Sequence, residues 1–188
     1  HIIVSDITRG KLLVLPTDLV DYGIDPKKTS VAKIVVMSCA IPFFFEPLKM
    51  MHHPTGISCY IVDGGVLSNF PVWLFDKSDP RWPTFGFRSY SRNVSNHKIT
   101  GLYTLLSSLF FTMMEAHDRR HIQEQDQLRT IQVTSNISHT DFGIKKDKVE
   151  ELYSAGKKAA DDFFKSWTFD SYLAVRGISR VSYKIKSR

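Results

Sequence analysis

The stretch of sequence that decides the fold is Tyr60-Ile-Val-Asp63-Gly64-Gly65-Val-Leu-Ser-Asn69-Phe-Pro71. Its apolar first part is typical of a buried β-strand, which ends abruptly at an aspartate and two glycines. Such an ending places a carboxylate at the C-terminal end of a strand, where open α/β sheets build their sites. The glycines permit a positive φ or a close approach of other backbone. Asp63 is therefore a candidate functional residue, with Gly64 and Gly65 shaping its turn; a purely structural Asp-Gly turn is the alternative.

The pattern on both sides of this stretch predicts strands that alternate with helices. Apolar runs bounded by turn residues predict strands at 2–4, 11–16, 58–62, 83–87 and 129–133. Helical spacing predicts helices at 31–39, 101–127 and 147–167. Ser68 or Asn69 with Pro71 indicates a further helix start before 72–75, and the Asp, Gly and Pro residues of 17–28 predict a loop. This alternation indicates an α/β sheet covered by helices. No repeat or linker divides the chain, so residues 1–188 are expected to form a single domain or part of one.

Composition and charge exclude several classes of protein. The chain has 188 residues, of which 43% are hydrophobic and 23% charged, so it is not disordered. No apolar run approaches the roughly 18 residues that a membrane span needs. The net charge of +6 is concentrated in residues 176–188, so we expect no nucleic-acid partner. This basic tail fits either a helix or an edge strand, and it could contact an anionic membrane through Arg176, Arg180, Lys184 and Arg188.

The residues that often bind metals or form disulfides do not gather into a motif. Cys39 and Cys59 are expected to be two buried thiols in a reducing compartment. His117 and His121 have helical spacing with Glu124, but arginines separate them, so a solvated helix face is the better interpretation. We expect no metal and no cofactor. The neighbouring pair His52-His53 is expected at the surface.

Two apolar stretches have both a structural and a functional interpretation. Phe43-Phe44-Phe45 follows Pro42, and core packing is the preferred role of at least one ring. The helical stripe from Leu102 to Met114 is likewise expected in the core, with a lipid-facing stripe as the alternative.

The order of these segments resembles that of the patatin-like phospholipases. Val62-Asp63-Gly64-Gly65 with Asn69 and Pro71 is similar to the Asp-Gly-Gly segment of that family. Further similar segments are Ser5-Asp6 with Gly10, Leu13–Pro16, Ser30–Pro47, Phe110–Asp118 and Arg129–Ile131, the last two in a bacterial branch. The resemblance covers nearly the whole chain. It implies part of a three-layer sheet with helices on both faces.

The family resemblance also implies a chemistry. Patatin-like phospholipases are serine acyl hydrolases with a Ser–Asp dyad, which makes Asp63 the dyad acid that takes and returns the proton of the nucleophile. The implied substrate is a phospholipid or another acyl lipid, with Pro42, Phe43 and Phe44 as possible lining of the acyl site. The implied location is cytoplasmic or peripheral at a membrane, and no cofactor is implied.

One departure from the family pattern concerns the nucleophile. The chain has no G-x-S-x-G elbow and no glycine-rich oxyanion loop, and both are expected before His1. The sequence therefore predicts the C-terminal portion of the domain, inactive alone and prone to self-association through uncovered core surface. The alternative is a non-catalytic truncated pseudo-enzyme that acts as a binding or assembly module. A Ser-Asp-His triad that uses His97, His117 or His121 is the minor alternative.

Overall fold

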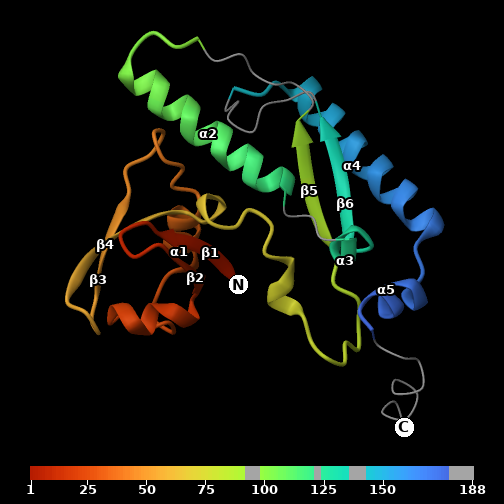
Figure 1. The fold of residues 1–188 in the computed structure, drawn as a ribbon, viewed down its shortest axis with the longest axis horizontal. Helices are drawn as coiled ribbons and strands as arrows, with labels where there is room; N and C mark the ends of the chain where they lie inside the picture. Colours follow the sequence, from red (N-terminus) through yellow and green to blue (C-terminus); the bar gives the residue numbers. More distant parts are fainter. Residues whose placement is uncertain (92–97, 121–123, 136–142, 178–188) are drawn as a thin grey trace. The chain divides into compact units, whose positions relative to one another are not determined.

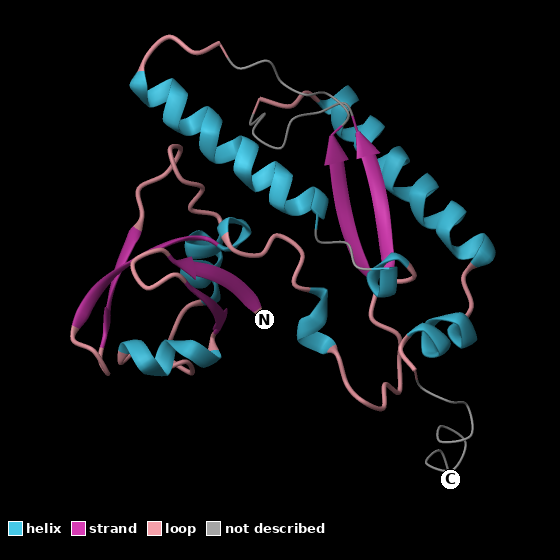
Figure 2. Ribbon diagram, viewed as in Figure 1, coloured by secondary structure: helices cyan, strands magenta, loops and turns pink. Residues whose placement is uncertain are grey.

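A computed structural model describes residues 1–91, 98–120, 124–135 and 143–177 (Figure 1). Its mixture of helices and strands confirms the predicted α/β class. The chain forms two compact units, each assembled from two separate stretches of sequence. The first unit contains His1–Pro71 and Leu105–Asp118, and the second contains Val72–Thr104 and Arg119–Arg188. Each unit has its own sheet, drawn in magenta in Figure 2.

The sheet of the first unit is antiparallel throughout and has the strand order β2-β1-β4-β3. Its strands are β1 (Ile2–Asp6), β2 (Lys11–Leu15), β3 (Leu48–His52) and β4 (Ile57–Asp63). The sequence predicts β1, β2 and β4 but misses β3, in which Met50 and His52 are buried and alternate with exposed residues. The prediction of a surface position for His52 is therefore wrong. Its side chain is 3% exposed and its ring packs edge-on against Tyr22.

Two short helices complete the core of the first unit. Helix α1 (Val31–Ser38) contributes Ile34 and Met37, and the 3₁₀ helix η1 (Thr17–Tyr22) contributes Leu19 and Tyr22. The segment of η1 is predicted as a loop because its aspartates and following glycine outweigh this apolar pair.

Cys59 is buried as predicted, whereas Cys39 is exposed. Cys39 follows the last turn of α1, and at that position its side chain lies outside the helix face that packs on the sheet. The prediction of two buried thiols is thus wrong for Cys39.

The second unit is built around a parallel strand pair, β5 (Gly86–Ser91) and β6 (Thr130–Ser135). Its helices are η3 (Val72–Phe75), α3 (Glu124–Gln127), α4 (Lys146–Ser166) and α5 (Phe169–Val175). Helix α4 packs on β6. Beside them, the Trp167 ring lies 4.9 Å from that of Phe85, and its indole N–H donates to the Leu128 carbonyl at 2.9 Å.

Helix α2 (Leu102–Arg120) differs from the prediction in its burial. Most of the apolar stripe expected in the core is open to solvent, with Leu109 55% exposed and Met113 63% exposed, whereas Phe110 and Met114 are half-buried. Helical spacing identifies an apolar face, but burial requires another element opposite that face. The described residues leave this face largely uncovered, and the exposed members are Leu102, Leu105, Leu106, Leu109 and Met113.

Parts of two predicted segments lie outside the described residues. These are residues 121–123, within the helix predicted at 101–127, and residues 178–188, which form most of the basic tail predicted as either a helix or an edge strand. Of the helices that the structure describes, none combines the length and the apolar content needed to cross a bilayer.

Candidate active site

Asp63 is the last residue of β4 and is held by backbone on two sides. It pairs with Val4 of β1, and its N–H donates to the carbonyl of Ala40, just after α1, at 3.0 Å. Its side chain is half-buried. The end of the strand therefore fixes where the carboxylate begins, while part of its surface remains open.

The Asp63 carboxylate combines partial burial with a hydrogen bond to one of its two oxygens. Oδ1 accepts the Gly65 N–H at 2.7 Å, and within the described residues Oδ2 has no hydrogen-bond partner. Burial raises the pKa of Asp63, and the bond from Gly65 only partly offsets that effect. The carboxylate is thus a stronger base than an aspartate in water, with one oxygen oriented and the other uncommitted.

Gly64 and Gly65 are required by close approach rather than by a special φ, because neither has a positive φ. A Cβ on Gly64 would lie 2.3 Å from the carbonyl oxygen of Ile3. A Cβ on Gly65 would lie 3.0 Å from Asp63 Oδ1 and 3.1 Å from Asn69 Oδ1. Any side chain at Gly64 would push the turn away from β1, so the turn needs glycine there.

Helix α2 brings an apolar neighbour to this turn that the sequence did not associate with it. The methyl group of Met114 would lie 3.5 Å from a Cβ on Gly65. One turn earlier on the same helix, the ring of Phe110 lies 5.5 Å from that of Phe43. Only the helical spacing of Met114 is visible in the sequence, and this spacing does not reveal which segment the helix meets.

The loop that follows Ala40 carries the three phenylalanines. Their prediction as core residues is wrong, since their exposed fractions range from 39% at Phe43 to 52% at Phe45. Phe43 has a φ of 71°, which is unusual for a residue other than glycine. The rings of Phe43 and Phe44 instead pack on α2, where Phe44 lies 5.9 Å from Phe111. Pro42 precedes them and is half-buried.

Two serines near the Asp63 turn, the buried Ser5 and the half-buried Ser38, do not contact the carboxylate. Ser5 Oγ donates to the Gly64 carbonyl at 3.3 Å, and Ser38 Oγ donates to the Ile3 carbonyl at 2.8 Å. Within the described part of the chain, no serine hydroxyl is hydrogen-bonded to Asp63. These residues supply a base and an apolar neighbourhood, but not a nucleophile in contact with that base.

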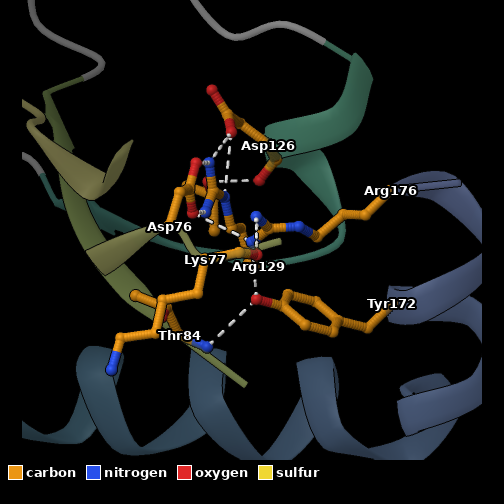
Figure 3. Close-up of polar contacts among 8 residues, drawn as sticks. Asp76, Lys77, Thr84, Asp126, Arg129, Tyr172 and Arg176 are labelled. Carbon is orange, nitrogen blue, oxygen red and sulfur yellow. Dashed lines mark hydrogen bonds and ion pairs between the residues drawn. The ribbon is translucent and has the colours of Figure 1, made fainter. Parts of the chain in front are cut away.

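A second polar cluster lies in the second unit and is fully paired (Figure 3). The buried Arg129 guanidinium binds Asp76 through two nitrogens and also binds Asp126 at 2.6 Å. Arg176 donates to Asp76 at 2.9 Å and to the Tyr172 hydroxyl at 2.9 Å. Burial alone would raise the pKa of Asp76, but the two arginines outweigh it and the pKa is lowered. Such a cluster joins elements together and leaves no free base.

Arg176 is also the first residue of the predicted membrane-contacting tail. Its guanidinium is engaged by Asp76 and Tyr172 and stacks over the Tyr172 ring. The other three basic residues of that prediction, Arg180, Lys184 and Arg188, lie outside the described residues.

The described residues do not form the metal site or the histidine-containing triad considered in the sequence. Among the described side chains, no three His, Cys, Asp or Glu residues gather as metal ligands would. His97 and His121 lie outside the described residues, and α2 places only the backbone of His117. A cavity of about 390 Å³ lies between β6 and α4, with Glu151, Lys158 and Asp162 in its wall.

Comparison with known proteins shows which family a segment of this chain resembles. The first unit has a half-buried aspartate and two glycines at the end of a sheet strand. Residues 5–76 match the sequence model of the patatin-like phospholipases. The matching segment contains the end of β1, all of β2 to β4, Asp63 and both glycines, so this part of the chain is similar to the patatin-like phospholipases.

Two relatives show how far the similarity extends. The chain is 42% identical over 172 residues to YqhO of Bacillus subtilis (strain 168), which is described as uncharacterized. That match includes 90% of this chain and 58% of the relative, so the chain spans little more than half of the relative's length. A stretch of 27 residues is 63% identical to the RpoH suppressor of Rhizobium meliloti (strain 1021) and covers 14% of this chain and 4% of that protein. No solved structure matches the chain.

Proposed function

We propose that this chain supplies the aspartate of a Ser–Asp dyad to a lipid acyl hydrolase, with residues 1–188 as the C-terminal portion of its domain. The observation that carries the proposal is the Asp63 carboxylate at the end of β4, with raised pKa, one oriented oxygen and one uncommitted oxygen. The serine belongs to a segment outside this sequence, in a G-x-S-x-G elbow that exposes its hydroxyl.

The proposed chemistry needs one proton to move twice. Asp63 takes the proton of the serine hydroxyl while the serine oxygen attacks the ester carbonyl, and the carboxylic acid then protonates the departing alcohol. The resulting acyl-enzyme is hydrolysed by a water molecule whose proton again passes through Asp63. A carboxylate at its ordinary pKa of about 4 is a weak base for this task, so partial burial favours the reaction.

The apolar surroundings support a lipid substrate. Phe43 and Phe44 pack against Phe110 and Phe111, and Met114 of the same helix lies beside the Asp63 turn. An acyl chain that contacts these side chains would be removed from water next to the base. We therefore propose a phospholipid or another acyl lipid as the substrate, with the apolar wall beside Asp63 receiving its acyl part. Membrane contact by the basic tail would depend on Arg180, Lys184 and Arg188, because Arg176 is already paired.

The test uses the complete natural polypeptide that contains these residues. Asp63→Asn should reduce hydrolysis of a p-nitrophenyl acyl ester at least about a thousandfold, with an unchanged circular dichroism spectrum. The matched control is Asp21→Asn, an exposed aspartate in the same unit, which should keep its activity. Retention of activity by Asp63→Asn would remove Asp63 from the chemistry.

A non-catalytic binding or assembly module is the second candidate, and the open apolar stripe of α2 favours it. A fluorophosphonate probe separates the two functions, because it labels an activated serine. The complete polypeptide should be labelled and the isolated 188-residue chain should not. An unlabelled, folded complete polypeptide would favour the binding module.

A further inference from the structure

The carbonyl oxygen of Gly64 accepts hydrogen bonds from three donors. It accepts the backbone N–H groups of Leu67 and Ser68 at 3.2 and 2.9 Å, and the hydroxyl of Ser5 at 3.3 Å. Ser5 lies on β1 and is 0% exposed. Its hydroxyl therefore joins the middle of one strand to the turn that follows the end of another.

A second serine hydroxyl binds on the β1 side of the contact between β1 and the Gly64 turn. The Ile3 carbonyl faces the α-carbon of Gly64 so closely that a Cβ there would lie 2.3 Å away. This carbonyl accepts the hydroxyl of Ser38, at the end of α1, at 2.8 Å. Two serine hydroxyls from different elements thus bind the two carbonyls at the closest approach of β1 to the turn.

These bonds matter because the strand ladder stops at Asp63. The register of β1 with β4 ends at the pair Val4–Asp63, so no ladder pairing positions the residues beyond it. Gly65 N–H nevertheless has to point at Asp63 Oδ1, and its direction follows from the position of the Gly64 peptide. Among the described side chains, Ser5 is the one that donates to this peptide from outside the turn.

We infer that Ser5 is a positioning residue, whose hydroxyl fixes the Gly64 peptide and through it the orientation of the Asp63 carboxylate. This inference rests on the proposed function, in which that carboxylate receives the serine proton. A merely structural role would let Ser5 affect stability without affecting the titration of Asp63.

The experiment compares Ser5→Ala with Thr130→Val in the complete polypeptide. Thr130 is a matched control, because its buried hydroxyl also donates to a backbone carbonyl, that of Asp126, in the second unit. The readouts are kcat, KM and the lower inflection of kcat/KM against pH, which reports the ionisation of the base in the free enzyme.

Loss of the Ser5 hydroxyl should weaken the bond from Gly65 that favours the ionised carboxylate. Ser5→Ala should then lower kcat about tenfold with KM within about twofold, and should raise the inflection by about half a pH unit. Thr130→Val should leave all three readouts unchanged. If Ser5→Ala fails to fold, Ser5→Cys keeps the volume with a weaker donor and should shift the inflection in the same direction.

The outcomes separate this inference from the proposed function. An unchanged inflection and kcat in a folded Ser5 variant, with Asp63→Asn inactive, would overturn the positioning role alone. Activity retained in Asp63→Asn would overturn the proposed function and this inference with it.

Discussion

At the scale of single residues, the Asp63 carboxylate binds a proton more readily than an aspartate in water, because its half-buried position disfavours the ionised form. Partial burial raises its pKa in the folded state above that in the unfolded chain. Its stabilising contribution is therefore fully present below the unfolded pKa, near pH 4, and is lost as the pH rises through the folded pKa.

Asp63→Asn should accordingly raise the midpoint of thermal unfolding at pH 7, because the variant has no carboxylate to ionise while its amide oxygen can still accept the Gly65 N–H. The gain over the natural chain should disappear near pH 3. Circular dichroism melts at both pH values provide the measurement, with Asp21→Asn as the control. A lower midpoint for Asp63→Asn at pH 7 would contradict this assignment of the pKa.

The two thiols should differ strongly in reactivity. Cys39 is exposed, whereas burial raises the pKa of Cys59 and the neighbouring Asp6 raises it further. Titration with a disulfide reagent at pH 8 should detect one fast thiol, and a second that reacts at least about a hundredfold more slowly until the chain unfolds. Cys39→Ser should abolish the fast phase and Cys59→Ser should preserve it. Two fast thiols would show that the core around Cys59 opens readily.

At the scale of elements, η1 is fastened to β1 through one buried carboxylate. Asp6 is 0% exposed, and its Oδ2 accepts the hydroxyl of Tyr22 at 2.6 Å. Its other oxygen accepts the N–H groups of Thr8 and Arg9, so β1 and the turn after it share the same acceptor. Burial and Asp6 together keep the pKa of Tyr22 raised, so the hydroxyl remains a donor.

Tyr22→Phe should therefore lower the free energy of unfolding by about 1.5–3 kcal/mol, because a buried carboxylate loses one of its donors. Urea denaturation followed by fluorescence measures the change. Tyr153→Phe, at a tyrosine that is 75% exposed, should change it by less than about 0.5 kcal/mol. Equal effects at both positions would show that the Tyr22 hydroxyl contributes little.

The Asp76 cluster joins the segment after η3 to β6 and α5 in the second unit. Because its pKa is lowered, Asp76 stabilises the fold above its unfolded pKa, near pH 4, and this contribution is lost as the pH falls through the folded pKa. Asp76→Asn should lower the free energy of unfolding by about 1–3 kcal/mol at pH 7, and by less below pH 4. Urea melts at pH 7 and pH 3.5 check this, with the exposed Asp161→Asn as the control. A pH-independent difference would argue against the charge pairing.

At the scale of the whole molecule, the open face of α2 should cause self-association. Leu109 and Met113 are both more than half exposed, and Leu105 lies one turn before Leu109. The chain should therefore elute above its monomer mass of 21.5 kDa at high concentration. Replacing Leu109 and Met113 by glutamate should return the mass measured by light scattering toward the monomer. Tyr153→Glu on α4 serves as the control, and a monomeric natural chain would contradict the expectation.

The sequence predicts most of the helices and strands, but it does not predict which distant segments pack against them. The strand that ends at Asp63 and helices α1 and α4 follow from apolar periodicity and turn residues, which are local properties. Strand β3 was not predicted because its alternating pattern is short, contains Lys49 and is flanked by prolines. The exposure of Phe43 and the proximity of Met114 to Gly65 depend on packing between distant segments, and local patterns carry no record of that packing.

The division of α2 between the two units has a consequence for anyone who wishes to cut or exchange parts of this protein. A fragment ended at residue 76, where the family match stops, would keep Asp63 but lose Leu105–Asp118, and with it Met114 and the ring that packs on Phe43. The remaining fragment would keep Phe43 and the Asp63 turn without the helix that packs on them. Chimaeras with relatives should therefore exchange His1–Pro71 together with Leu105–Asp118, because the order of segments in the sequence and their grouping in space do not coincide.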